Sequence, residues 1–273
     1  MINMLSINKE TCNKCAICSI VCSFGLIDID EDSYPREVTE ADQFCNRCGA
    51  CVAACPTASV NHNDIPLEKS ILINPGLEID FEKSTQLVKT RRSIRAYKDE
   101  PVPRETIFQL IDAARYAPTG ANQQNVKWLV IDDKEKMKRI REIGADFVLE
   151  TVKANFPMYA QALHFFNERR EAGYDIFLHG APAIVCTYGT NQMPAPSTNC
   201  IIALSYFDLL ANSAGLGCCW LGFFTNAANS FDPIKEIVAL PPENEVYASM
   251  IVGYPRYKYQ RIPVRNPADI IWR

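Results

Sequence analysis

The chain has 273 residues, of which 48% are hydrophobic and 22% are charged, a globular composition long enough for one large domain or two smaller ones. Residues 1–66 carry four Lys/Arg against nine Asp/Glu, a net charge of −5, whereas the remainder carries 24 against 23. Nucleic-acid-binding proteins present a basic face, so this charge pattern argues against a nucleic-acid partner. No apolar run reaches the roughly 18 residues of a membrane helix, and the first residues lack the basic and apolar regions of a signal peptide. We therefore expect a cytoplasmic protein with no membrane partner.

Two runs of cysteine with the same spacing dominate the first part of the chain. Each run reads C-x₂-C-x₂-C-x₃-C, the spacing of bacterial two-cluster ferredoxins, in which the fourth cysteine ligates the other cluster. Thiolates are soft ligands that suit iron–sulfur clusters, zinc or copper(I). The spacing therefore predicts two [4Fe–4S] clusters, one held by Cys12, Cys15, Cys18 and Cys55 and the other by Cys45, Cys48, Cys51 and Cys22.

Zinc and disulfides are the alternatives for these cysteines. A zinc ribbon uses two separated C-x₂-C pairs, but each run here has a third and a fourth cysteine. A disulfide framework is typical of short secreted chains. Residues 1–66 resemble the two-cluster ferredoxins, with one departure: Ser23 stands where proline usually follows the first run, whereas Pro56 follows the second.

The expected elements of this first part are short. Strands are predicted at residues 5–7, 27–30 and 58–62 in a pseudo-two-fold arrangement, with the fourth cysteine of each run beginning a short helix. Such a module is too small for a proper core, so cluster ligation would supply the missing stability. Residues 67–80, interrupted by the turn Asn74-Pro75-Gly76, are expected to form a connecting segment.

Helical and strand patterns alternate through the rest of the chain. Asp80 is expected to cap a helix over residues 81–90, and apolar periodicity predicts further helices at 104–116, 134–143, 198–214 and 231–238. Residues 145–178 are expected to be mostly helical. Buried strands are predicted at 128–131, 181–188 and 247–254, and a strand or turn at 218–223. The remaining cysteines (Cys186, Cys200, Cys218 and Cys219) lie in apolar surroundings and are interpreted as buried free thiols.

A second group of residues indicates a phosphate-bearing heterocycle. Residues 91–95 read Arg-Arg-Ser-Ile-Arg, residues 118–124 form a loop rich in amides, and Gly215-Leu216-Gly217 ends the helix before residues 218–223. Arginine forks match phosphate oxygens bidentately, and Asn and Gln pair with the imide edges of a flat ring. No G-x-G-x-x-G motif or P-loop is present, so a dinucleotide fold of the usual sort is not indicated.

These pieces occur in the order found in nitroreductase-family flavoproteins, which the chain resembles from about residue 81 to its end. The matching segments are Arg91 to Arg95, Pro118 to Gln124, His179 to Pro182, Gly215 to Gly222, and Gly253 to Pro255. The resemblance implies FMN bound at the interface of a homodimer. One departure affects the loop: a Pro-Trp or similar pair usually follows it, whereas Asn125-Val126-Lys127-Trp128 intervenes here, which leaves the register of the loop open.

The resemblance also implies which residues contact FMN. The arginine–arginine–serine run would meet the phosphate and the pyrimidine edge, the loop would contribute from the partner subunit, and backbone near Leu221 and Gly222 would approach the flavin N5/O4 edge. A late basic residue would close on the phosphate. The implied contacts are Arg91, Arg92, Ser93, Arg95, Pro118, Thr119, Asn122, Gln124, Leu221, Gly222 and Arg261. No catalytic acid or base stands out.

The predicted fold class is α+β: a small ferredoxin-like domain over residues 1–66, a connecting segment over 67–80, and a nitroreductase-like FMN-binding α+β sandwich over 81–273. Clusters carry single electrons at low potential, and FMN delivers two electrons as hydride. We therefore expect an oxidoreductase that passes electrons from reduced ferredoxin or a similar low-potential donor through the clusters to FMN, and on to a small nitro, quinone, enone or carbon–halogen substrate. The alternatives are an electron-transfer adaptor between a ferredoxin and a larger redox partner, and an NAD(P)H-dependent nitroreductase with accessory clusters.

Overall fold

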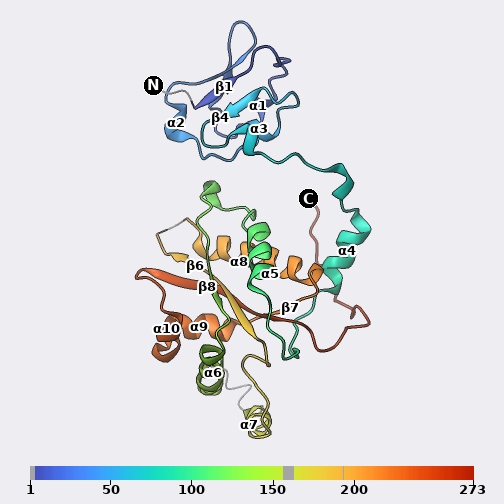
Figure 1. The fold of residues 1–273 in the computed structure, drawn as a ribbon, viewed down its shortest axis with the longest axis vertical. Coiled ribbons are helices and arrows are strands. Elements are labelled where there is room, and N and C mark those ends of the chain that lie inside the picture. Colours follow the sequence, from blue (N-terminus) through green and yellow to red (C-terminus); the bar gives the residue numbers. More distant parts are fainter. Residues whose placement is uncertain (1–3, 156–162, 193) are drawn as a thin grey trace. The chain divides into compact units, whose positions relative to one another are not determined.

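The computed structural model describes residues 4–155, 163–192 and 194–273. Its contacts divide the chain into two compact units (Figure 1). The first unit comprises Met1–Glu78 with Ala121–Gln123, and the second comprises Ile79–Gly120 with Gln124–Arg273. None of the helices in the described ranges combines the length and the apolar character needed to cross a membrane.

Two small antiparallel strand pairs form the frame of the first unit. Strand β1 (Leu5–Ile7) pairs with β4 (Val60–His62), and β2 (Ile27–Ile29) pairs with β3 (Pro35–Glu37). Three single-turn helices lie between them: α1 (Ile17–Ile20), α2 (Ala41–Phe44) and α3 (Ala50–Ala53). The buried apolar side chains are few (Met4, Leu5, Cys18, Leu26, Ile27, Ala41, Val52 and Val60). A core of this size contributes little folding free energy by itself.

The predicted strands of the first unit are confirmed at β1, β2 and β4, but the predicted start of the short helices is wrong. Helix α1 contains Cys18 and helix α3 contains Cys51, so each helix carries the third cysteine of its run. The fourth cysteines, Cys22 and Cys55, follow the helix ends. The turn of helix therefore brings the third and fourth cysteines to different sides of the loop. Strand β3 and helix α2 were not predicted.

Residues 67–80 contain only two single 3₁₀ turns, η1 (Leu67–Lys69) and η2 (Pro75–Leu77). Between them the side chains of Ile71, Leu72 and Ile73 are 85–92% exposed. The boundaries expected at residues 66 and 81 stay predictions, and the contact-based division falls between Glu78 and Ile79.

A four-stranded antiparallel sheet forms the centre of the second unit. Its order is β5 (Lys127–Ile131), β6 (Ala183–Thr190), β8 (Asn244–Gly253) and β7 (Gly217–Trp220). Val185 of β6 lies opposite Met250 of β8, and a register shift interrupts the β6–β8 pair between Thr187 and Tyr188. The two central strands are almost wholly buried, which indicates that both faces of the sheet are covered.

Helices cover the two faces of this sheet (Figure 1). Ala183 and Val185 of β6 pack in one cluster with residues of α5 (Arg104–Ala114) and α8 (Pro196–Ser213). Ile184 and Cys186 pack on the other face with α6 (Lys134–Asn155), α9 (Gly222–Ser230) and α10 (Asp232–Val238). Successive residues of β6 face opposite sides of the sheet because side chains alternate along a strand. The result is the predicted α+β sandwich, here with three layers, to which α4 (Phe81–Thr90) and α7 (Leu163–Glu171) are added.

Most predicted elements of the second unit are confirmed within a few residues. The Asp80 side chain caps α4 by accepting a hydrogen bond from the Lys83 backbone N–H at 2.8 Å. The predicted helix at 134–143 continues to Asn155, and part of the helical region expected at 145–178 falls on residues 156–162, outside the described residues. The strand or turn predicted at 218–223 is wrong in its second half, because helix α9 begins at Gly222.

Candidate cofactor sites

Two pockets in the first unit are each lined by four cysteines. Both pockets combine the first three cysteines of one run with the fourth cysteine of the other, as the spacing rule requires. The eight cysteines are all free thiols. The first pocket contains Cys12, Cys15, Cys18 and Cys55, and the second contains Cys45, Cys48, Cys51 and Cys22. This three-plus-one arrangement fits two cubane clusters and supports the predicted ligand sets.

Left-handed backbone turns bring the cysteines of each loop together. Lys14 and Ala16 have φ values of 58° and 59°, and Arg47 and Gly49, at the same places in the second run, have φ values of 53° and 73°. A left-handed conformation costs a residue other than glycine about 1–2 kcal/mol. Strain of this kind persists where the surroundings enforce it, and it gathers at ligand-binding sites. The paired strain in both loops is what cluster ligation would enforce.

The thiols differ in how readily they lose a proton. Burial raises the pKa of Cys18, and it raises the pKa of Cys51 to about 11. Burial also acts to raise the pKa of Cys55, but N–H donors of Ser59, Thr57 and Val60 outweigh it and leave that pKa lowered. Because ligation requires thiolates, metal binding must displace the protons of Cys18 and Cys51, the third cysteines of the two runs.

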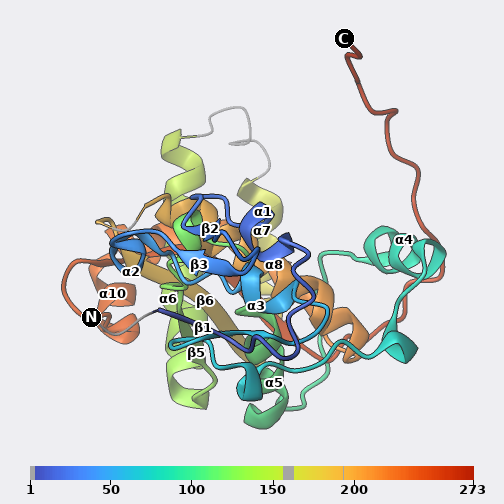
Figure 2. The same ribbon diagram turned by 90° about the horizontal axis from the view of Figure 1, so that it is seen from above.

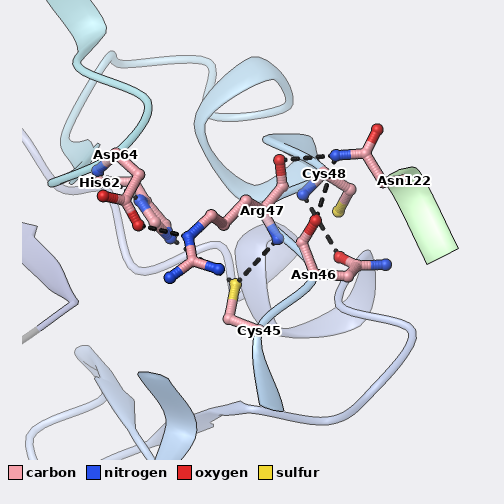
Figure 3. A network of polar contacts seen from close by, with 7 residues as sticks. All are labelled: Cys45, Asn46, Arg47, Cys48, His62, Asp64 and Asn122. Atoms are coloured by element: carbon pink, nitrogen blue, oxygen red, sulfur yellow. Dashed lines mark hydrogen bonds and ion pairs between the residues drawn. The ribbon is translucent and has the colours of Figure 1, made fainter. Parts of the chain in front are cut away.

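A buried histidine lines the second cysteine pocket (Figure 3). His62 is the last residue of strand β4 and is 2% exposed. Its Nδ1 accepts a hydrogen bond from the Asp64 backbone N–H at 3.0 Å, and its Nε2 lies 3.6 Å from Cys45 Sγ. Burial lowers the pKa of His62. Sequence analysis assigned this residue no role because the cysteines alone satisfy both predicted clusters.

Polar contacts also fix the loop of the second run (Figure 3). Arg47 Nε donates to Asp64 Oδ2 at 2.6 Å, and the Arg47 backbone N–H donates to Cys45 Sγ at 3.4 Å. Asn122, in the short segment that groups with the first unit, donates from Nδ2 to the carbonyl oxygens of Asn46 and Arg47 at 3.1 and 2.9 Å. The amide of Asn122, predicted to contact FMN, is therefore engaged by this loop.

The second unit contains a cavity of about 520 Å³, within the range of cofactor pockets. Four segments far apart in the sequence line it: the end of α4 with the two following arginines, one face of α8, the turn before β7, and the chain after β8. Its lining residues are Gln86, Thr90, Arg91, Arg92, Ile94, Asp208, Asn212, Gly215, Leu216, Gly217, Cys218, Pro255, Tyr257, Lys258 and Tyr259. The Ile94 backbone N–H donates to the Cys218 carbonyl at 2.9 Å, which fixes the arginine segment beside β7.

The two arginines in this cavity have different environments. Arg91 Nη1 lies 3.4 Å from Oδ2 of Asp208, whose side chain is 6% exposed. Burial raises the pKa of Asp208, and the opposing effects of Arg91 and Trp220 do not cancel it. Arg92 Nη1 donates to the Arg91 carbonyl, but the Arg92 Nε–H is buried and has no partner among the described residues. A buried donor without an acceptor costs free energy, so a phosphate oxygen would fit this position.

Two glycines near β7 have different surroundings. A Cβ on Gly217 would lie 2.4 Å from Ile94 Cγ1 and 2.9 Å from Pro255 Cγ, so only glycine lets the arginine segment pack this closely. Gly222, the exposed first residue of α9, has nothing within 4 Å of an added Cβ. The contact between Gly222 and the flavin that the resemblance implies stays a prediction.

The structure does not gather all predicted flavin contacts in one place. Arg91 and Arg92 line the cavity, whereas the other predicted contacts do not: Ser93, Arg95, Pro118, Thr119, Asn122, Gln124, Leu221, Gly222 and Arg261. Thr119 Oγ1 accepts a hydrogen bond from the Gln124 N–H at 3.0 Å, and Asn199 Oδ1 accepts one from the Gly120 N–H. These two hydrogen bonds fix the ends of the amide-rich loop. The roles of its residues toward a partner subunit stay predictions.

Sequence analysis did not place three residues that line this cavity. Asp208 and Asn212 lie on α8, and Lys258 lies in the chain after β8. An acidic residue inside an apolar helix is costly to bury without a partner, so Asp208 was a detectable signal. Lys258 lines the cavity and Arg261 does not, although both side chains are exposed, and the role expected for Arg261 stays a prediction.

Comparison with known proteins matches each part of the chain to a family. The model of the nitroreductase family matches residues 88–254, and that of a 4Fe-4S dicluster domain matches residues 4–72. The FMN reductase [NAD(P)H] of Bacillus subtilis is 28% identical over 182 residues, which cover 66% of this chain and 68% of the relative. The polyferredoxin protein MvhB of Methanothermus fervidus is 39% identical over 71 residues, 25% of this chain and 15% of the relative.

A solved structure supports the fold of the second unit. The crystal structure of a nitroreductase with bound FMN from Bacteroides fragilis aligns with a TM-score of 0.55 at 19% identity, covering 69% of this chain and 98% of that one. The family match spans more than half of the chain and covers the four-stranded sheet together with Arg91 and Arg92. The chain therefore belongs to the nitroreductase family of FMN-dependent oxidoreductases and carries an N-terminal 4Fe-4S dicluster domain.

Proposed function

We propose that electrons pass from a low-potential one-electron donor through two [4Fe–4S] clusters to FMN, and on to a small electrophilic substrate such as a nitro compound, quinone or enone. The observation that carries this proposal is that one chain holds two three-plus-one cysteine pockets and an arginine-lined cofactor cavity. Hydride from a nicotinamide needs no one-electron relay, whereas FMN accepts electrons one or two at a time. Fused clusters therefore favour a one-electron donor.

In this proposal each cofactor is held by its own set of residues. The eight cysteines of the two runs hold the clusters, each run completing the other's set. Arg91 and Arg92 bind the FMN phosphate, Arg92 through its unpartnered Nε–H, and Ser93 and Arg95 support them. Backbone at Leu221 and Gly222 meets the flavin ring, where the space beside Gly222 is open.

Two lysines would guide an acidic donor such as reduced ferredoxin. Lys9 and Lys14 each lie over the Tyr34 ring, 4.7 and 4.3 Å from its centroid, and Lys14 stands between Cys12 and Cys15 in sequence. The other two cations of this region are paired, Arg36 with Asp28 and Arg47 with Asp64. Electrostatic steering by exposed cations raises association rates, which would offset the net acidic charge of residues 1–66.

We propose that the protein is a homodimer whose C-terminal tail packs on the partner. Beyond β8 the tail has no helix or strand (Figure 2). Val264, Ile271 and Trp272 are 96%, 77% and 86% exposed in the single chain. Apolar side chains exposed to this degree mark an interaction surface. Light scattering of the flavin-loaded chain should give a dimer, and a monomer that retains tightly bound FMN would contradict this assembly.

The electron route is tested by stopped-flow spectroscopy under argon with the full-length, flavin-loaded chain. The Cys15→Ser and Cys48→Ser variants each remove one ligand from one predicted cluster. Ser6→Ala, an exposed change on strand β1 at a residue that lines neither cysteine pocket, is the matched control. We expect reduced ferredoxin to reduce the flavin in the native chain and in Ser6→Ala, and both cysteine variants to slow this step strongly.

The competing function is a direct NAD(P)H-dependent reductase with accessory clusters, which the printed name of the Bacillus subtilis relative favours. The same experiment with NADH and NADPH separates the two. If the cysteine variants and the native chain turn over equally fast with a nicotinamide, and ferredoxin fails with all of them, electrons do not pass through the clusters.

A further inference from the structure

The buried imidazole of His62 has a defined hydrogen-bonding state. Its Nδ1 accepts the Asp64 backbone N–H at 3.0 Å, so that nitrogen carries no proton. A neutral ring with an accepting Nδ1 carries its proton on Nε2. Nε2 lies 3.6 Å from Cys45 Sγ, within reach of an N–H···S hydrogen bond. The backbone therefore aims a donor at the sulfur of a predicted cluster ligand (Figure 3).

We propose that His62 is a positioning residue that raises the reduction potential of the second cluster above that of the first, an inference that rests on the proposed two-cluster function. When a cluster gains an electron, negative charge increases on its sulfurs. A hydrogen bond donated to a ligand sulfur stabilises that charge, and hydrogen bonding to sulfur is one of the factors that set cluster potentials. His62 thus favours the reduced state of the cluster held by Cys45, Cys48, Cys51 and Cys22.

The internal symmetry of the unit supplies a reference for this effect. The fourth cysteine of each run accepts a backbone hydrogen bond four residues on: Leu26 N–H to Cys22 Sγ at 3.3 Å, and Ser59 N–H to Cys55 Sγ at 3.2 Å. These contacts match in distance and position. Seven residues after the fourth cysteine, however, the first half has Ile29 and the second half has His62. Isoleucine has no donor, so the imidazole contact has no counterpart at the symmetric position.

One side-chain donor also lies near a ligand of the first cluster and would raise the potential of that cluster, but its contact is weaker. Thr57 Oγ1 lies 3.8 Å from Cys55 Sγ, and the same hydroxyl lies 2.7 Å from Ser59 Oγ. The hydroxyl is therefore shared with a nearer oxygen. Cys45, in contrast, receives the Arg47 backbone N–H at 3.4 Å in addition to the imidazole. The ligands of the second cluster therefore receive the stronger hydrogen bonds, and we expect this cluster to be reduced first.

Burial and one backbone hydrogen bond hold the His62 ring, which is 2% exposed and accepts the Asp64 N–H at Nδ1. The Asp64 side chain pairs with Arg47, Nε to Oδ2 at 2.6 Å, with both side chains more than half exposed, and exposed pairs contribute little to stability. The same residues thus connect the loop of the second run to the imidazole.

The test is a redox titration followed by electron paramagnetic resonance on the full-length, anaerobically reconstituted protein. The two signals are assigned with Cys15→Ser and Cys48→Ser, which disturb one cluster each. In His62→Leu we expect the signal of the second cluster to become harder to reduce by about tenfold in its equilibrium constant, the typical effect of one charge-assisted hydrogen bond, or about 59 mV for one electron. Ile29→Leu is the matched control and should leave both potentials unchanged.

Iron, sulfide and flavin contents separate the two proposals. Fewer than about eight irons per native chain, or zinc in their place, contradicts the two-cluster function. Full iron in both the native chain and His62→Leu with equal second-cluster potentials, or a shift in the first cluster instead, overturns the role of His62. If His62→Leu fails to assemble clusters, pulsed resonance on the native chain grown with ¹⁵N-histidine decides. Coupling of one imidazole nitrogen to the reduced second cluster is expected, and its absence overturns the proposal.

Discussion

Arg91 and Arg92 are adjacent and line the same cavity, but only one of them already has an acidic partner. Arg91 faces the buried Asp208, whereas the Arg92 Nε–H is buried with no acceptor among the residues that the structure describes. The sequence could predict that these two cations meet a phosphate, because an arginine run in this context matches a family pattern. It could not predict which of them is committed elsewhere, since Asp208 lies 116 residues further along the chain than Arg92.

Replacing Arg92 with alanine should weaken FMN binding. Loss of a charge-assisted hydrogen bond costs about 1.5–3 kcal/mol, roughly ten- to a hundredfold in affinity. Fluorescence titration of the apoprotein with FMN measures this, with Lys98→Ala as the control, because Lys98 is exposed and does not line the cavity. Equal affinities for Arg92→Ala and the native chain would mean that the phosphate lies elsewhere.

Asp208→Asn should stabilise the flavin-free protein at neutral pH. Burial raises the pKa of Asp208, so the folded chain binds this proton more tightly than the unfolded chain, and the charged carboxylate costs stability once the pH exceeds the raised pKa. Asparagine keeps the shape without the charge. The variant should melt at a higher temperature at pH 7, and the difference should shrink as the pH falls toward the ordinary value of 3.8.

Melting temperatures of Asp208→Asn and of the native chain, measured across this pH range, test the prediction. A variant that is less stable than the native chain at pH 7 would show that the ion pair with Arg91, at 3.4 Å, outweighs the burial of Asp208.

At the scale of elements, prediction succeeded where the burial pattern is strong. Strand β6 is a run of buried apolar residues, and helix α8 has a wide apolar face, so the hydrophobic pattern defined both. Helix α9 was missed because it opens with glycine and, apart from two alanines, consists of Phe, Thr, Asn and Ser, which have low helix propensity. Tertiary packing against β8 and α10 stabilises it instead. Strand β3 has three residues and begins with proline, too short for a pattern.

Helix α6 depends on a glycine at its contact with the core. A Cβ added to Gly144 would lie 2.1 Å from two atoms of the Phe177 ring, which is 2% exposed and cannot move freely. Alanine usually favours a helix over glycine by about 1 kcal/mol, but overpacking a core costs about 1–3 kcal/mol or more. We expect Gly144→Ala to destabilise the protein in urea unfolding.

The control for this change is Lys138→Ala, an exposed position of the same helix. It should leave the unfolding midpoint nearly unchanged. A Gly144→Ala variant as stable as the control would show that α6 shifts away from Phe177 at little cost.

At the scale of the whole molecule, the two halves differ in how much the sequence reveals. The cysteine runs are local, so their spacing alone predicted the grouping that lines the two pockets. The cavity of the second unit is assembled from four distant segments, and residues such as Asn212 and Lys258 enter it only through the fold. The position of His62 against Cys45 likewise depends on strand pairing between β1 and β4, which no spacing rule describes.

The two units should also respond differently to loss of iron. The first unit has a small apolar core, and metal ligation contributes directly to the folding free energy of such domains, whereas the second has a sheet buried on both faces. Removing iron from the full chain with a chelator under argon should therefore raise amide hydrogen exchange across β1 to β4 and leave β6 and β8 protected. Removing FMN instead should leave β1 to β4 protected. Strands β1 and β4 that keep their protection without iron would mean that the small core suffices, and loss of protection in β6 would mean that the two units do not fold independently.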